Sequence, residues 1–88
     1  MMPLALCPPG ERVEVVHIRG RRLRERLRSM GITEGTVGHV LQGHGLGVIL
    51  KVGNTRIAIG RGAAHKVLVR VLTPDEENPR PLASQVRP

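Results

Sequence analysis

Arginine dominates one short stretch of this 88-residue chain. Residues 19–28 contain six arginines and one glutamate, which gives the stretch a local net charge of +5. Arginine carries a planar fork of donors that suits carboxylate and phosphate groups. The stretch therefore predicts a docking surface for an anionic partner, and a solvated helix face on a basic protein is the alternative interpretation.

The histidines and the single cysteine are the residues that could bind a metal. His17, His39, His44 and His65 are dispersed, and none forms the closely spaced pair of a known metal motif. A site for a transition metal, Fe(II) or Zn(II), would require His44, His39, His65 or Cys7 to meet in the fold or across a homo-oligomer. The spacing leaves this open beside the interpretation that these are ordinary surface, strand or structural residues.

Few residues could support catalysis, so the chain is predicted not to be an enzyme. Residues 1–72 contain four glutamates, and none is paired in a way that favours acid–base chemistry. Gly43, Gly45 and Gly47 lack the following helix and Lys-Ser/Thr of a phosphate-binding loop. Cys7 has no neighbouring base that would activate a thiol.

Composition narrows the class of partner and the compartment. The net charge is +7 and the pI is near 11.5, which indicates an anionic partner. Phe, Tyr and Trp are absent, and this argues against a binder that stacks nucleic-acid bases. One cysteine, no apolar run of about 18 residues and no signal peptide predict a cytoplasmic protein.

Short elements must position these residues. Residues 1–72 are predicted to form one domain, and the Pro-rich residues 73–88 a disordered C-terminal tail. A flexible loop is expected at Gln42–Gly47. Closing a small sheet removes exposed edges, so the pattern predicts a mainly β, partly open barrel of about five strands. The predicted strands are Val13–Ile18, Thr36–Leu41, Val48–Val52, Thr55–Ile59 and Val67–Leu72.

One short helix is predicted between the first two strands. Leu23, Leu27 and Met30 recur at helical spacing, so residues 21–30 should form a helix with these side chains facing the core. Gly31 stands where a left-handed cap belongs, and Ile32 could pack back onto the last turn. A further helical turn is expected at residues 63–66.

Two blocks of the sequence resemble the FeoA family. After Pro9-Gly10, the run Arg26-Leu27-x-x-Met30-Gly31-Ile32-x-x-Gly35 is similar to that family's first motif. The run Ile57-Ala58-Ile59-Gly60-Arg61-x-Ala63-Ala64-x-Lys66-Val67-x-Val69 is similar to its second block. Together they span nearly the whole predicted domain. The chain departs from the pattern at Glu34, where the family often has proline, and in the short connection Gln42–Gly47.

The resemblance implies an SH3-like β-barrel with an inserted helix. It also implies a cytoplasmic accessory protein of the ferrous-iron transporter FeoB in bacteria, with transition-metal binding often attached to such domains. Docking on the cytoplasmic part of the transporter would use Arg22, Arg26 and Arg61. The predicted structural residues are Leu23, Leu27, Met30 and Ile32 as helix anchors, Gly31 as the cap and Gly35 as the turn.

Two alternative functions follow from the same features. A basic barrel of this size could bind nucleic acid, and such binding would weaken steeply with salt. A related barrel at the end of diphtheria-toxin-repressor-like regulators acts as an interaction module, so a metal-responsive module is the second alternative.

Overall fold

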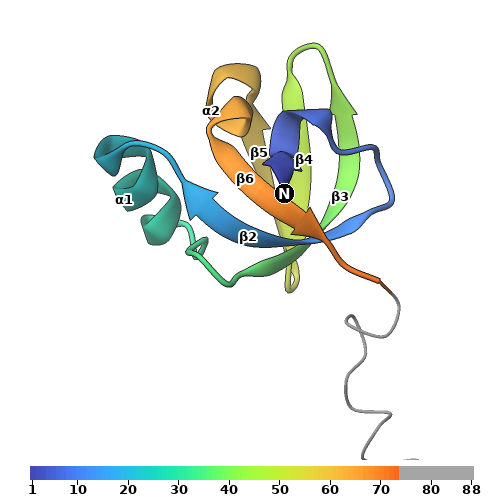
Figure 1. Cartoon of the computed structure of the whole chain (residues 1–88), viewed down its shortest axis with the longest axis horizontal. Helices are drawn as coiled ribbons and strands as arrows, with labels where there is room; N and C mark the ends of the chain where they lie inside the picture. Colours follow the sequence, from blue (N-terminus) through green and yellow to red (C-terminus); the bar gives the residue numbers. More distant parts are fainter. Residues whose placement is uncertain (74–88) are drawn as a thin grey trace, which may run out of the picture.

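The computed structural model of the chain describes residues 1–73, so the predicted tail lies outside the described residues except for Thr73. The secondary structure agrees with the expected order of strands and helices and adds a short N-terminal segment (Figure 1). The elements are β1 (Met2–Pro3), the 3-10 turn η1 (Leu4–Leu6), β2 (Arg12–Ile18), α1 (Arg21–Ser29), β3 (Val37–His44), β4 (Gly47–Val52), β5 (Thr55–Gly60), α2 (Arg61–His65) and β6 (Val67–Val71).

The strands form one antiparallel sheet in the order β1-β6-β2-β3-β4-β5. The register shifts between Val15 and His17 in β2 and between Val40 and Gln42 in β3. An extra residue in one strand bends it and increases its twist, so these shifts help the sheet to curl (Figure 1). The expected small, partly open β-barrel with an inserted helix is therefore confirmed, with β1 and β5 as its edges.

Two short elements lie at the opening of the barrel. α2 contacts η1 and the strands β4, β5 and β6, and η1 also contacts β4 and β6. The sequence did not predict β1 or η1, because two or three residues are too few to show a periodic pattern. Both matter for packing, since Leu4 of η1 is fully buried.

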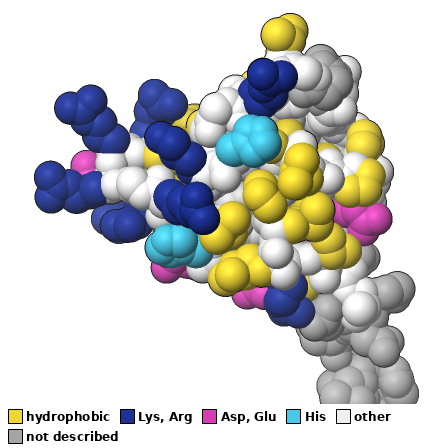
Figure 2. All heavy atoms as spheres, turned by 45° about the horizontal axis from the view of Figure 1, so that its top comes forward, with side chains coloured by type: hydrophobic (Ala, Val, Ile, Leu, Met, Phe, Trp, Pro, Cys, Tyr) yellow, Lys and Arg dark blue, Asp and Glu magenta, His cyan; other side chains and the backbone are white. Residues whose placement is uncertain are grey.

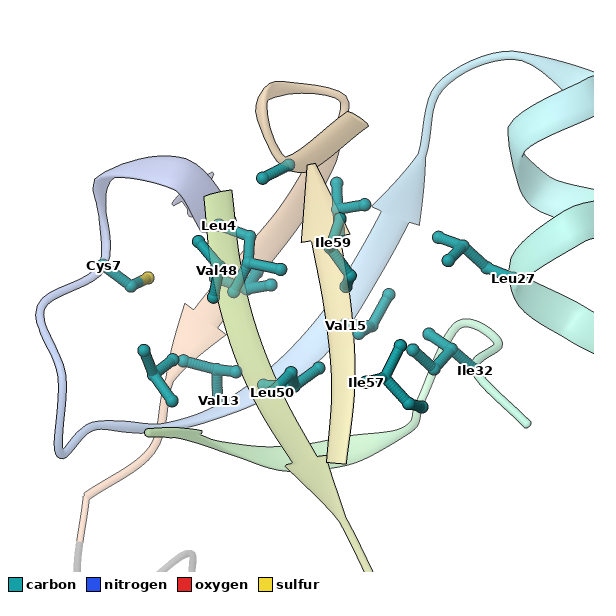
Figure 3. Packing of buried hydrophobic residues seen from close by; sticks show 14 of the residues in the cluster. Leu4, Cys7, Val13, Val15, Leu27, Ile32, Val48, Leu50, Ile57 and Ile59 are labelled. Carbon is teal, nitrogen blue, oxygen red and sulfur yellow. The ribbon is translucent and has the colours of Figure 1, made fainter. Parts of the chain in front are cut away.

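The core is entirely aliphatic apart from one thiol. The curl of the sheet brings the inward-facing side chains of β2, β4 and β5 together in its interior (Figure 3). Its buried members are Leu4, Cys7, Val13, Val15, Ile18, Leu27, Ile32, Val40, Val48, Leu50, Ile57, Ile59, Ala64, Val67 and Val69.

The flexible loop predicted at Gln42–Gly47 is wrong. Gln42 pairs with Ile49 and Gly43 with Val48, so β3 continues to His44 and only two residues, 45 and 46, connect it to β4. Gly47 serves close packing here, because a Cβ at this position would collide with the carbonyl oxygen of Ile59. A glycine-rich stretch is thus part of the sheet.

The end of α1 has the geometry of a Schellman motif. The N–H of Gly31 donates to the carbonyl of Arg28, and the N–H of Ile32 donates to the carbonyl of Leu27, both at 2.9 Å. Gly31 has a φ of 90°, a conformation that glycine adopts without steric cost. Gly35, at φ 96°, turns the chain and donates its N–H to the carbonyl of Val15 at 2.7 Å.

The anchors of α1 differ from the expectation at one position. Leu27 is 2% exposed, Ile32 is fully buried, and Leu23 packs against the core while partly exposed. Figure 3 shows Leu27 projecting from α1 towards the part of the core where Val15 and Ile32 lie. The prediction that Met30 faces the core is wrong, because its side chain is 42% exposed. The helix ends at Ser29, and the reversal at the cap places Ile32, not residue 30, against Leu27.

Candidate docking site between the two helices

A groove of about 500 Å³ lies between α1 and α2. α1 forms one wall, and α2 with the residue that follows it forms the other. Figure 2 shows Lys and Arg side chains gathered over the end of the molecule that α1 forms. We call this feature the basic groove; its lining residues are Arg22, Leu23, Arg26, Gly62, Ala63 and Lys66.

Backbone hydrogen bonds and buried side chains fix both walls. The N–H of Arg19, just after β2, donates to the carbonyl of Lys66 at 2.9 Å. This hydrogen bond connects the segment before α1 to the residue that follows α2. α2 is held by its fully buried Ala64 and by a 3.1 Å hydrogen bond from the N–H of Arg61 to the carbonyl of Leu46. Leu27 attaches α1 to the core. The groove is therefore a preformed feature of the fold.

The groove combines an apolar lining with cationic side chains. Leu23 and Ala63 are partly buried hydrophobic residues that pack against the core, whereas Arg22 and Arg26 are exposed and one helical turn apart. A Cβ on Gly62 would meet no atom within 4 Å, so that wall stays open. The site thus combines two exposed arginines with a small apolar surface.

The positive charge of the groove is not neutralised within the described residues. Among these residues, the hydrogen-bonded pair of His17 and Glu34 at 3.2 Å and the ion pair of Arg70 and Glu14 at 2.7 Å involve none of the groove's lining residues. Across residues 1–73, neither groove arginine has an acidic partner within ion-pair distance. The basic groove is therefore open to an anionic group from outside the described chain.

The start of α1 adds to this concentration of charge. Gly20 provides no side-chain cap, and the first turn contains no acidic residue but does contain Arg21 and Arg22. Cations near a helix N-terminus oppose the helix dipole, typically by about 0.3–1 kcal/mol each. The helix therefore keeps arginines where they do not help its own stability, which is typical of a binding surface.

The predicted contact residues do not all fall in the groove. Arg22 and Arg26 line it together, while Arg61, the exposed first residue of α2, is not among its lining residues. Lys66 completes the cationic lining and was missed as a contact residue. The available signal was its place at the end of the predicted helical turn, but only the fold shows that it lines the same groove as the arginines.

The candidate metal ligands are not brought together among the side chains that the structure describes. No group of three or more His, Cys, Asp and Glu residues there could hold a metal ion. His39 Nε2 lies 3.2 Å from the carbonyl oxygen of Gly10, and His39 is paired with Arg12 on one strand and Lys51 on the other. His65 ends α2. The side chain of His44 lies outside the described part.

Cys7 is a buried core residue. Its side chain is 4% exposed, and its Sγ lies 3.9 Å from the carbonyl oxygen of Pro3. Burial raises the pKa of the Cys7 thiol above its ordinary value, and the nearby Glu11 carboxylate raises it further. The thiol therefore stays protonated near neutral pH, which disfavours both nucleophilic and metal-ligand chemistry.

A second, apolar hollow of about 210 Å³ lies beside the β3–β4 hairpin. At its rim, Leu46 is 84% exposed. The lining residues are Gln42, Leu46, Gly47, Val48, Ile49, Ala58, Ile59 and Gly60.

The fold is thus a small curled β-barrel with a basic groove between its two helices. None of the helices in residues 1–73 has the length and apolar character to cross a bilayer. The FeoA domain family model matches residues 2–71. The chain therefore belongs to the FeoA family, as its two sequence blocks indicated.

Similar proteins share most of this domain. A protein of Methanocaldococcus jannaschii named "Putative Fe(2+) transport protein A" is 41% identical over 70 residues, which is 78% of this chain and 85% of the relative. A crystal structure of an iron uptake regulatory protein (FeoA) is 44% identical, covers 81% of this chain and 97% of its own, and has a TM-score of 0.74. The solution structure of FeoA from Chlorobium tepidum is 25% identical, covers 90% of this chain and 78% of its own, and has a TM-score of 0.72.

Proposed function

We propose that this protein is a non-enzymatic accessory protein of ferrous iron uptake that docks on the cytoplasmic part of a FeoB-type transporter. The match to the FeoA family over residues 2–71, with relatives named for iron transport and uptake, carries the proposal. The basic groove supports it, because an unneutralised cationic groove is suited to an acidic surface of a partner protein. Arg22, Arg26 and Arg61 are the proposed contacts.

Docking changes the activity of the transporter only under one condition. A ligand shifts an equilibrium by the difference between its affinities for the two states. The protein must therefore bind one conformation or nucleotide state of the transporter more tightly than the other. An affinity that changes with the bound nucleotide would be the signature of modulation.

Calorimetric titration of this protein into the purified cytoplasmic region of the FeoB-type transporter from the same organism tests the proposal. We expect saturable binding whose affinity differs between the GDP-bound and GTP-analogue-bound forms. No binding to either form would refute docking, and equal binding to both would refute modulation.

A pair of charge reversals tests the role assigned to Arg61. Arg61→Glu changes the exposed first residue of α2, and Arg56→Glu makes the same change on an exposed position of β5. We expect the first variant to bind the transporter region several-fold more weakly and the second to bind like the unmodified protein. Equal effects would show that overall charge, and not Arg61, sets the affinity.

A further inference from the structure

We propose that the basic groove binds an extended acidic peptide segment with two carboxylates two residues apart and a small apolar side chain between them. This inference rests on the proposed function, since it specifies the chemistry of the segment through which a partner protein would dock. Three observations carry it: the spacing of the groove arginines, the apolar side chains of Leu23 and Ala63 in the two walls, and a lining without acidic residues among residues 1–73.

The spacing of the arginines matches an extended peptide. Arg22 and Arg26 are four residues apart on α1, and four helical residues rise by about 6 Å. Alternate side chains of an extended chain lie on one side, about 6.6 Å apart. Two carboxylates at positions i and i+2 of a peptide lying along α1 would therefore each meet one guanidinium, which suits two-point hydrogen bonding to carboxylates.

The other wall defines the residue between the two carboxylates. That side chain points away from α1 and so towards α2, where Gly62 and Ala63 present almost no side chain. The free space around Gly62 leaves room for a small group, and the methyl of Ala63 favours an apolar one. Lys66, on the same wall, adds a third cation near the peptide.

The same observations favour a peptide over a nucleic acid. A phosphate backbone offers nothing that would use the partly buried apolar surface of Leu23 and Ala63. The chain contains no aromatic side chain on which bases could stack. The cationic surface on α1 is also short, because nine helical residues span only about 14 Å.

Fluorescence anisotropy with a labelled peptide containing Glu-Ala-Glu between glycines tests the inference. We expect saturable binding that weakens as salt is raised, and no binding of the matched Gln-Ala-Gln peptide. No binding of Glu-Ala-Glu at low salt would overturn the inference.

The double variant R22E/R26E reverses the two groove arginines and should weaken Glu-Ala-Glu binding by about tenfold or more. The control R21E/R28E makes the same change in net charge on exposed arginines of the same helix that do not line the groove. Each pair also places one glutamate in the first turn of α1 and one in the last, so the effects on helix stability are matched. An equal loss in both variants would overturn the groove assignment.

Two further outcomes separate this inference from the proposed function. Peptide binding that R22E/R26E abolishes, without any binding to the transporter region, supports the groove chemistry and refutes the transporter as partner. Transporter binding that R22E/R26E leaves unchanged supports docking and overturns the groove as its site. A short DNA duplex that displaces the peptide and binds more tightly at equal salt would overturn the peptide in favour of nucleic acid.

Discussion

Replacing Leu27 by alanine should destabilise the protein far more than replacing Met30, although both belong to the same apolar pattern in the sequence. Leu27 is 2% exposed and Met30 is 42% exposed. Leu27→Ala removes three buried carbon groups. At about 0.8 kcal/mol each, the lost transfer free energy is about 2.4 kcal/mol, without the cost of the cavity that is left. The cavity raises the expected loss to about 2.5–4 kcal/mol. Met30→Ala should cost about 0.5 kcal/mol or less.

These losses are large for a domain of this size. A folded unit of 73 residues has a free energy of unfolding of about 4–11 kcal/mol, so Leu27→Ala removes a substantial share of it. For domains of this length 1 kcal/mol corresponds to about 4–8 °C, which predicts a fall in Tm of about 10–30 °C.

Urea unfolding followed by far-ultraviolet circular dichroism is the suitable assay, because the chain contains no Trp or Tyr to report by fluorescence. The slope of the transition should stay constant while its midpoint falls, which indicates a change in stability and not in the surface exposed on unfolding. If Leu27→Ala costs less than about 1 kcal/mol, or the same as Met30→Ala, Leu27 is not the anchor of α1 and the reasoning from burial fails.

Three further predictions concern the cap, the thiol and the candidate metal ligands. Gly31→Ala should lower the free energy of unfolding by about 1 kcal/mol, because Gly31 has a φ of 90°. The control Gly62→Ala lies at an open helical position and should leave the free energy of unfolding unchanged or raise it. Equal urea midpoints for the two variants would contradict this. The raised pKa of Cys7 means that the folded state holds the thiol proton more tightly. The contribution of Cys7 to stability should therefore be constant below pH 9.0 and be lost as the pH rises through the folded pKa; urea midpoints that rise with pH there would contradict the sign. His39→Gln should leave any Fe(II) or Zn(II) binding seen by calorimetry unchanged, because Arg12 and Lys51 flank the imidazole; loss of binding would restore His39 as a ligand.

The sequence was sufficient to predict the elements whose signals are local. Strands β2 to β6 and helix α1 follow from alternating or helical apolar patterns, and the Gly31 cap follows from a glycine just after the last apolar turn. These features depend on backbone preferences and nearest neighbours, so they can be seen without the fold. The first and second FeoA-like blocks gave the family for the same reason, since each is a contiguous run.

Other features depended on contacts between distant parts of the chain. Whether the glycines near residue 45 form a loop or a strand depended on pairing with β4 and on the close approach of Ile59 to Gly47. Met30 fell on the predicted apolar stripe but lies outside the core, because the backbone reverses at the cap and places Ile32 against Leu27.

The candidate site divides in the same way. The sequence by itself determined that six arginines would be concentrated around one short helix and that Leu27 would tie this helix to the barrel. Only the tertiary structure decided that Arg22 and Arg26 face Lys66 and Ala63 across a groove, and that Arg61 does not line it. The physical reason is that charge and hydropathy are properties of residues along the chain, whereas a groove is made by two segments some 40 residues apart that the curled sheet brings side by side.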